Sequence, residues 1–143
     1  MRLFDVNILV YLHREDLPQH SAVFEWFNEF ARSGQPFAIP DLIFSGFLRI
    51  VTHRRIFDSP SQLVDALAFA DDLRAHTNCV SITPGRGHWE IFTRLCREAD
   101  ARGNFVPDAF LAALAIESGS DLVTADRGFG RFPGLSVIYP LTT

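Results

Sequence analysis

Short apolar segments alternate along this chain with longer segments whose apolar residues recur at helical spacing. The chain opens with MRLFDVNILVYL, which reads as a buried strand running into a helix. Further short strands are predicted at 37–40, 79–83, 121–126 and 135–140, and helical patterns occupy 17–36, 41–57, 59–76, 84–103 and 104–119. Such alternation favours an α/β fold, with three α/β/α layers around a mostly parallel central sheet.

Two polar residues interrupt the apolar opening segment. Asp5 directly follows Leu3 and Phe4, and Asn7 comes two residues later. Burying an ionisable group is costly unless hydrogen bonds or a bound charge compensate for its lost hydration. Asp5 therefore either caps the helix that follows it or binds a ligand, and Asn7 is either a functional group or a local turn former.

Two more aspartates are placed to meet Asp5 in space. Asp126 ends the strand segment 121–126, and Asp108 lies in the first turn of the helix that leads to that strand. The carboxyl ends of parallel strands meet at one edge of a sheet, so three carboxylates can converge there. Oxygen ligands of this kind suit Mg²⁺ or Mn²⁺. The alternatives are structural, since Asp108 also complements a helix dipole and Asp126 suits a turn.

Length and composition predict one soluble domain spanning residues 1–143. Of its 143 residues, 48% are hydrophobic and 21% are charged. Charged or polar residues interrupt every apolar stretch before the roughly 20 residues that a membrane span needs. With no basic leader at the start, we expect a cytoplasmic protein. Cys79 and Cys96 lack the spacing of a zinc site and are expected to be buried thiols.

The chain contains no lysine, because all 13 of its basic residues are arginines. Walker A loops, receiver-type phosphoacceptor sites, haloacid-dehalogenase-type phosphatases and Schiff-base enzymes normally need a lysine amine. The sequence therefore argues against all four classes. The net charge of -4 also disfavours a general nucleic-acid coat protein, although it is compatible with a nuclease that gathers carboxylates around a cation.

Four segments together resemble one known family. FDVNILVYL at the start, SGFLRIVTHRRIF in the middle, NFVPDAFLAALAIE later and DLVTADRGFGRFPGL near the end occur in the order and spacing of PIN-domain proteins. More specifically, the chain resembles the VapC-type toxin ribonucleases of toxin-antitoxin pairs. The resemblance covers essentially the whole chain.

The resemblance implies a function and a set of site residues. It implies a PIN-domain endoribonuclease that depends on Mg²⁺ or Mn²⁺, with Asp5, Asp108 and Asp126 as catalytic, metal-binding acids and Asn7 and Thr124 as polar groups supporting them. It further implies an RNA substrate, a homodimer, and a cognate VapB-type antitoxin whose C-terminal segment blocks the groove.

One position departs from the family pattern. Where family members usually carry a glutamate, within a Ser-Glu-hydrophobic-Leu-Arg pattern, this chain has Gly46 between Ser45 and Phe47. Asp41 lies five residues earlier, a rotation of roughly 500° along a helix, and so does not share the face of Gly46. Glu117 faces away from Asp108 by the same reasoning, and we expect it in a solvated or interface role. Water is then expected to fill the place of the missing fourth carboxylate.

Several arginines and phenylalanines are candidates for contact with RNA. Arg127 and Arg131 follow the last acid, Asp126, within a glycine-rich loop and are suited to phosphate contact. Arg49 belongs to a basic helix end that is either a solvated terminus or an RNA-contacting patch. Phe129 and Phe132 are expected to be exposed, for stacking or for partner contact.

The sequence is compatible with two alternatives to an active nuclease. Loss of the glutamate at Gly46 is also compatible with a catalytically weak PIN-like module that binds RNA or protein without cutting it. A phosphatase on a similar sheet is a third reading, weakened by the absence of lysine. Incubation of the purified protein with RNA, in Mn²⁺ or in EDTA, separates the nuclease from the binding module.

Overall fold

A five-stranded parallel sheet forms the centre of the computed structural model, which describes residues 1–141. The strand order is β3-β2-β1-β4-β5, and every neighbouring pair is parallel. The strands are β1 (Arg2–Phe4), β2 (Phe37–Ala38), β3 (Cys79–Val80), β4 (Asp121–Val123) and β5 (Val137–Ile138). The predicted α/β/α class is confirmed, whereas the single-domain organisation of residues 1–143 stays a prediction.

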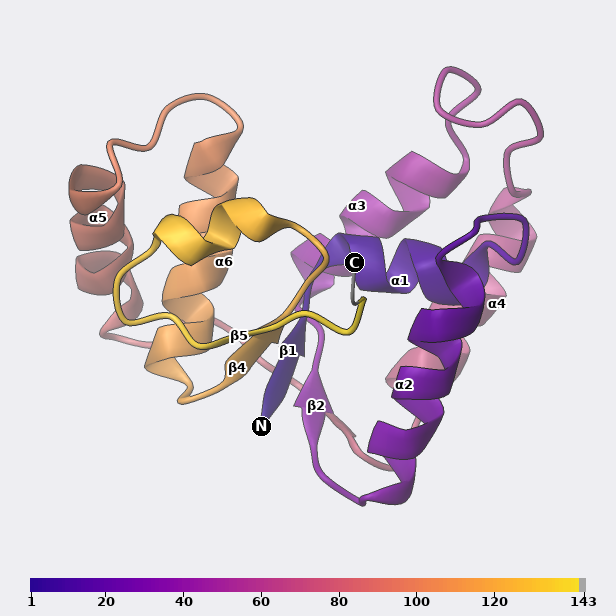
Figure 1. Ribbon diagram of the computed structural model, residues 1–143, viewed down its shortest axis with the longest axis horizontal. Coiled ribbons are helices and arrows are strands. Elements are labelled where there is room, and N and C mark those ends of the chain that lie inside the picture. The colour runs from indigo at the N-terminus through magenta and orange to yellow at the C-terminus, as the bar shows by residue number, and fades with distance from the viewer. Residues whose placement is uncertain (142–143) are drawn as a thin grey trace.

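Helices cover both faces of this sheet (Figure 1). One side carries α1 (Val6–His13), α2 (His20–Arg32), α3 (Asp41–Val51) and α4 (Leu63–Arg74). The other side carries α5 (His88–Glu98) and α6 (Phe105–Glu117). The glycine-rich segment predicted as a loop contains a short 3₁₀ helix, η1 (Arg127–Arg131). Within residues 1–141, none of the helices has the length and hydrophobicity of a membrane span.

Neighbouring residues of each inner strand point into different cores. Leu3 and Leu122 pack with α5 and α6, whereas Phe4 and Val123 pack with α1 to α4. All four side chains are fully buried. Because side chains alternate across a strand, a strand buried on both faces must be apolar at every position, which explains the unbroken apolar run before Asp5.

The α1–α4 side of the sheet is packed with aromatic rings. The ring of Phe4 stacks on Phe37 with centroids 5.0 Å apart, and its edges contact Trp26, Phe27 and Phe30. Aromatic pairs in such arrangements stabilise a core beyond the effect of area burial alone. This packing fixes β1 at the sheet centre, directly before Asp5.

Phe129 and Phe132 are not exposed, and the prediction that they are was wrong. They retain only 1% and 3% of their accessible surface and pack in the α5–α6 core. The cause is η1, which turns both rings inward, so that Phe132 lies 4.6 Å from the ring of Phe105. Cys79 and Cys96 are free thiols and only partly buried, so they are less enclosed than expected.

The central position of Phe4 predicts a large cost for removing its ring. Phe4→Ala should lower the free energy of unfolding by about 3 to 5 kcal/mol, because a fully buried aromatic leaves a cavity. Phe24→Ala is the matched control, since that side chain is 47% exposed. Urea denaturation of both variants measures the difference, and equal losses would contradict this assignment of the core.

Candidate active site

Asp5 sits at the carboxyl end of β1, where it caps α1. Its Oδ1 accepts a hydrogen bond from the backbone N–H of Val6 at 2.7 Å, and its own N–H donates to the carbonyl of Val123 at 3.0 Å. The side chain is buried, with 7% of its surface exposed. Asp5 therefore performs the capping role that the sequence allowed, and its second carboxylate oxygen remains for other contacts.

The second oxygen of Asp5 is held by two side chains. Thr124 Oγ1 donates to Asp5 Oδ2 at 2.7 Å, and Asn7 Nδ2 lies 3.2 Å from the same oxygen. Asn7 also donates to Thr124 Oγ1 and accepts from the backbone N–H of Ala125, both at 3.1 Å. The start of α1 is thereby tied to the end of β4, as expected of polar groups that support an acid.

Asp126 follows β4 at the same edge of the sheet. Its backbone N–H donates to Thr124 Oγ1 at 3.0 Å, and its Oδ1 accepts from the N–H of Gly128 at 2.8 Å. The carboxylate caps η1 and is exposed. Asp126 thus acts as a turn residue and also lies beside the hydrogen bonds that hold Asp5.

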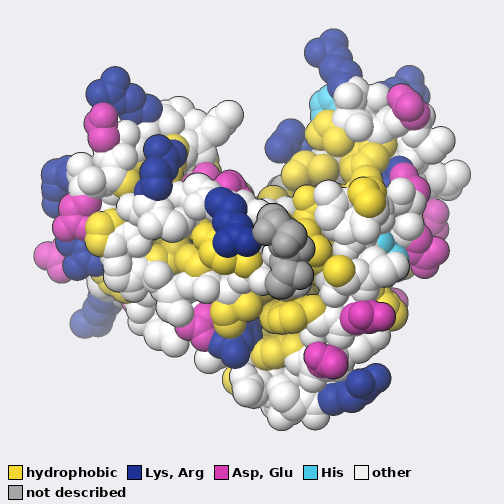
Figure 2. Space-filling model, in the orientation of Figure 1, with side chains coloured by type: hydrophobic (Ala, Val, Ile, Leu, Met, Phe, Trp, Pro, Cys, Tyr) yellow, Lys and Arg dark blue, Asp and Glu magenta, His cyan; other side chains and the backbone are white. Residues whose placement is uncertain are grey.

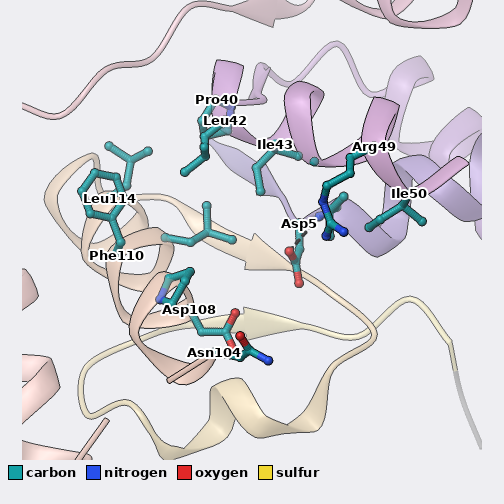
Figure 3. A pocket seen from close by; sticks show the side chains of 14 residues that line it. Asp5, Pro40, Leu42, Ile43, Arg49, Ile50, Asn104, Asp108, Phe110 and Leu114 are labelled. Atoms are coloured by element: carbon teal, nitrogen blue, oxygen red, sulfur yellow. Dashed lines mark hydrogen bonds between the residues drawn. The ribbon is translucent and has the colours of Figure 1, made fainter. Parts of the chain in front are cut away.

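Asp108 approaches this edge from the first turn of α6. Pro107 precedes it, in a position where the missing N–H of proline costs the helix nothing. Asp108 lines the same cleft as Asp5, and Figure 3 shows both carboxylates in that cleft. The structure therefore brings the three predicted acids to one edge of the sheet from three distant parts of the chain.

The pKa values of two acids reflect this crowding. Burial raises the pKa of Asp108 to about 6, and the negative charges of Asp5 and Asp126 add to the effect. Burial also raises the pKa of Asp5, with Asp126 contributing, while the hydrogen bonds from Thr124, Val6 and Asn7 oppose the rise. Mutual repulsion among these groups shows that they share one electrostatic environment, which a cation would relieve.

A cleft opens from these acids between α3 and α6. Its volume is about 300 Å³, and its polar lining comes from Asp5, Arg49, Asn104 and Asp108. The rest is glycine and apolar side chains: Val6, Pro40, Leu42, Ile43, Gly46, Ile50, Pro107, Phe110, Leu111 and Leu114. Figure 2 shows a notch with acidic groups at its floor and basic groups on both rims.

Comparison with known proteins agrees with this geometry. Residues 2–135 match the PIN domain. Over 140 residues the chain is 41% identical to Ribonuclease VapC25 of Mycobacterium tuberculosis, covering 98% of this chain and 99% of that one. It is 40% identical over 140 residues to Ribonuclease VapC31 of the same species, with the same coverage.

The chain belongs to the PIN-domain family of VapC ribonucleases. Its fold is also similar to the crystal structure of VapBC2 from Rickettsia felis bound to a DNA fragment from its promoter. That likeness has a TM-score of 0.71 at 18% identity and covers 96% of both chains. The resemblance of the sequence to PIN-domain VapC-type ribonucleases is thus confirmed.

Gly46 of this PIN domain faces the cleft. A Cβ atom added there would meet only Val6 Cγ2, at an ordinary contact distance of 3.7 Å. Nothing in the packing therefore requires a glycine at this position. The place where the family usually carries a glutamate is open and adjoins the acids.

The three predicted RNA-binding arginines lie in different settings. Arg49 lines the cleft on the α3 side. The guanidinium of Arg127 stacks 4.1 Å from the ring centre of Tyr139, and that of Arg131 lies 4.0 Å from the ring centre of Phe105. Arg127 and Arg131 are exposed residues of η1, directly after Asp126. All three remain predicted contacts.

Glu117 and Asp41 lie outside this group. Glu117 accepts hydrogen bonds from the backbone N–H groups of Gly85 and Gly87, at 2.7 and 2.9 Å, so it fixes the loop before α5. The expectation of a solvated or interface role missed this contact. Asp41 forms an exposed ion pair with Arg74, away from the cleft lining.

Asn104 is a cleft residue that was not predicted from the sequence. It precedes α6 by one residue, lines the cleft, and lies beside Asp108 in Figure 3. Its spacing of four residues from Asp108 was the available signal, because residues i and i+4 share a helix face. Phe110 was missed as well, since its spacing is typical of a core position.

The donor set of this PIN domain fits a hard divalent cation. Asp5, Asp108 and Asp126 offer carboxylate oxygens, and Asn104 adds an amide oxygen on the same side. Within residues 1–141, no group of three or more acidic, histidine or cysteine side chains is arranged so that all of them could hold one metal ion. Mg²⁺ usually takes only one or two protein carboxylates and keeps water as its other ligands, so the donor set is compatible with such a site.

The raised pKa of Asp108 predicts a pH-dependent gain in stability when its charge is removed. A carboxyl group whose folded pKa is about 6 binds a proton more tightly folded than unfolded, so stability is lost as pH rises from about 4 to about 6. In EDTA, Asp108→Asn should therefore melt a few degrees above the wild type at about pH 7.5. The gain should vanish below about pH 4, where both side chains are neutral.

Thermal unfolding of the wild type and the variant at both pH values measures this effect. Asp72→Asn is the control, because Asp72 is an exposed residue of α4. A gain of equal size at both pH values would show that repulsion at Asp108 is not its cause.

Proposed function

We propose that this VapC-family protein is an endoribonuclease whose catalytic acids are Asp5, Asp108 and Asp126. The observation that carries the proposal is the convergence of the three carboxylates at one edge of the sheet, where Asp5 and Asp108 line the cleft and the charges of Asp5 and Asp126 raise the pKa of Asp108. Capping accounts for Asp5 and Asp126 separately, but it does not account for their crowding with Asp108, since buried and crowded acids cost stability. Such costly groups are typical of functional sites.

The proposal includes a divalent cation, Mg²⁺ or Mn²⁺, held by these acids. A cation bound there supplies a Lewis acid that lowers the pKa of water and neutralises charge on a scissile phosphate. The chain's own contribution is to orient the acids. Hydrogen bonds from Thr124 and Asn7 fix the Asp5 carboxylate, and the N–H of Gly128 fixes that of Asp126.

RNA phosphates are the proposed partners of three arginines. Arg49 stands on the α3 wall of the cleft, where a guanidinium can pair with a phosphate close to the acids. Arg127 and Arg131 are exposed on η1 and are held by aromatic rings, which reduces the entropy lost on binding. These arginines supply positive charge on α3 and on η1, and Figure 2 shows basic groups on both rims of the notch.

Regulation by a VapB-type antitoxin and assembly as a homodimer complete the proposal. The toxin-antitoxin role accords with the VapC relatives and with the VapBC2 structure. Support for a protein contact comes from α4, where Leu63, Val64 and Leu67 are 57%, 67% and 41% exposed. Exposed apolar groups of this kind often mark interaction surfaces. We place the protein in the cytoplasm, where its RNA substrate is found.

The second candidate is a PIN-like module that binds RNA or protein with little cleavage. Gly46 is the observation that favours it, because no carboxylate stands where the family usually has a glutamate. The two candidates differ in one result. Purified protein should cut RNA in Mn²⁺ and not in EDTA if the first is correct, whereas RNA that is bound but intact in Mn²⁺ would favour the second.

Neutralising any one acid should abolish cleavage. Asp5→Asn, Asp108→Asn and Asp126→Asn preserve shape while removing charge, and each should lower the cleavage rate on the order of 100-fold or more. A double variant should be scarcely worse than a single one, because groups that act as a unit are not additive. Gel assays of RNA cleavage and growth arrest on expression measure the loss.

Asp72→Asn serves as the matched control and should keep full activity, since Asp72 is exposed on α4. Circular dichroism verifies that each variant is folded. Full toxicity in a folded Asp5→Asn protein would refute the assignment of Asp5.

The open space at Gly46 predicts that an added carboxylate will strengthen metal binding. Gly46→Glu places a new oxygen ligand beside Asp5 and should tighten Mn²⁺ binding about tenfold. Gly46→Ala provides no ligand and should leave the affinity unchanged. Calorimetric titration of Mn²⁺ into the wild type and both variants compares the affinities. An unchanged affinity in folded Gly46→Glu would mean that this position does not reach the cation.

A further inference from the structure

We propose that the cleft between α3 and α6 holds one unpaired base of the RNA, stacked on Phe110. This inference rests on the proposed function and specifies how that site engages its substrate. The base lies in the apolar part of the cleft, while its phosphate lies toward the acids and Arg49. The same cleft thus reads a nucleobase and presents the neighbouring phosphodiester to the acids.

The cleft has two chemically different ends. Asp5, Arg49 and Asp108 supply charge at one end, and the apolar side chains of α3 and α6 supply the rest of the wall. In Figure 3, Leu42 and Ile43 of α3 lie across the cleft from Phe110 and Leu114 of α6. A ligand that fills this space must carry an anionic group and an apolar body beside it. A nucleotide has this combination.

Phe110 is braced from behind. His88 Nε2 donates to the carbonyl of Phe110 at 2.9 Å, and the two ring centres are 4.3 Å apart. Phe92 contacts the same ring edge-on, with centres 5.5 Å apart. His88 is itself buried, with 3% of its surface exposed. The ring is therefore held in place before any ligand binds, so stacking on it loses little conformational entropy.

Gly46 leaves the α3 wall of the cleft without a side chain at this position. A side chain at this position would start 3.7 Å from Val6 and extend into the cleft, since the residue is part of the lining. Its absence joins the acid end to the apolar end in one space of about 300 Å³. That volume is at the small end of ligand pockets, and so suits one nucleotide better than a long peptide segment.

Unpaired bases are the part of RNA that proteins read most often. Single-stranded loops present bases that can be splayed out and stacked on aromatic side chains. Stacking of one base on an aromatic side chain typically changes affinity about tenfold or more. A short antitoxin segment is the competing occupant of the cleft, and the experiment includes it as an outcome.

Binding of nucleotides with and without a base tests the inference directly. The four ribonucleoside 5′-monophosphates and ribose 5-phosphate are titrated into the protein with Mg²⁺ present, and binding is followed by NMR. At least one nucleotide should bind about tenfold more tightly than ribose 5-phosphate and should shift the ring resonances of Phe110.

Two pairs of matched variants localise the effect. Phe110→Leu and Gly46→Val should each remove the preference for the base, from opposite walls of the cleft. Trp89→Leu removes a 67% exposed ring of α5 that lies outside the cleft lining, and Ser45→Val adds the same side chain as Gly46→Val to an exposed position of α3. Both controls should keep the preference, and melting curves verify that all four variants are folded.

RNA cleavage in Mn²⁺ distinguishes failure of this inference from failure of the proposed function. We call the proposed binding place of the base in the cleft the base slot. Equal binding of ribose 5-phosphate and every nucleotide would overturn the base slot, while continued cleavage would leave the nuclease assignment standing. Loss of cognate antitoxin binding in Gly46→Val with nucleotide binding unchanged assigns the cleft to the peptide, and also overturns the slot. A base preference without cleavage supports the slot and refutes the nuclease.

Discussion

The hydroxyl group of Thr124 is the contact on which the arrangement of the site depends. A hydroxyl has one proton and two lone pairs, and here all three are used. Its proton goes to Asp5, while its lone pairs accept from Asn7 and from the backbone N–H of Asp126. Thr124 is fully buried, so leaving any of these hydrogen bonds unmade would cost the full desolvation penalty of the unpaired group. The ends of β1 and β4 are thereby fixed relative to one another.

The sheet and the acids have opposite energetic demands. The sheet is stabilised by apolar strands buried on both faces, and this same burial makes the Asp5 carboxylate costly. Hydrogen bonds from Val6, Asn7 and Thr124 offset part of that cost. No hydrogen bond lowers the pKa of Asp108. Burial and the charges of Asp5 and Asp126 therefore raise that pKa, to about 6. The acids are therefore an electrostatically unfavourable group at the edge of an otherwise well-packed sheet.

The sequence predicted the parts of this structure that depend on periodic pattern. Alternation of apolar strands with helices indicated the parallel sheet, and the positions of Asp5 and Asp126 after strands indicated their common edge. Pattern failed where local backbone geometry decided the outcome. The 3₁₀ turn of η1 buried Phe129 and Phe132, which a glycine-rich segment does not reveal.

Contacts between distant segments were equally hard to foresee. Glu117 meets two backbone N–H groups of the loop before α5, about thirty residues earlier, and no spacing rule connects them. The bracing of Phe110 by His88 and Phe92 depends on how α5 packs against α6. A single sequence shows that such rings are apolar, but not which one borders a cleft.

The glycine at position 46 connects the energetics of the helix with the shape of the cleft. Glycine inside a helix costs about 0.5 to 1 kcal/mol relative to alanine. Steric need does not explain this cost, because a Cβ atom would make only an ordinary contact with Val6. The loss of stability at Gly46 is instead linked to open space beside Asp5, because α3 has no side chain at this position of the cleft lining. The α6 wall differs, since Phe110, Leu111 and Leu114 all line the cleft there and the ring of Phe110 packs against His88 and Phe92. One wall thus supplies room and the other supplies a rigid surface, and the acids lie where the two meet.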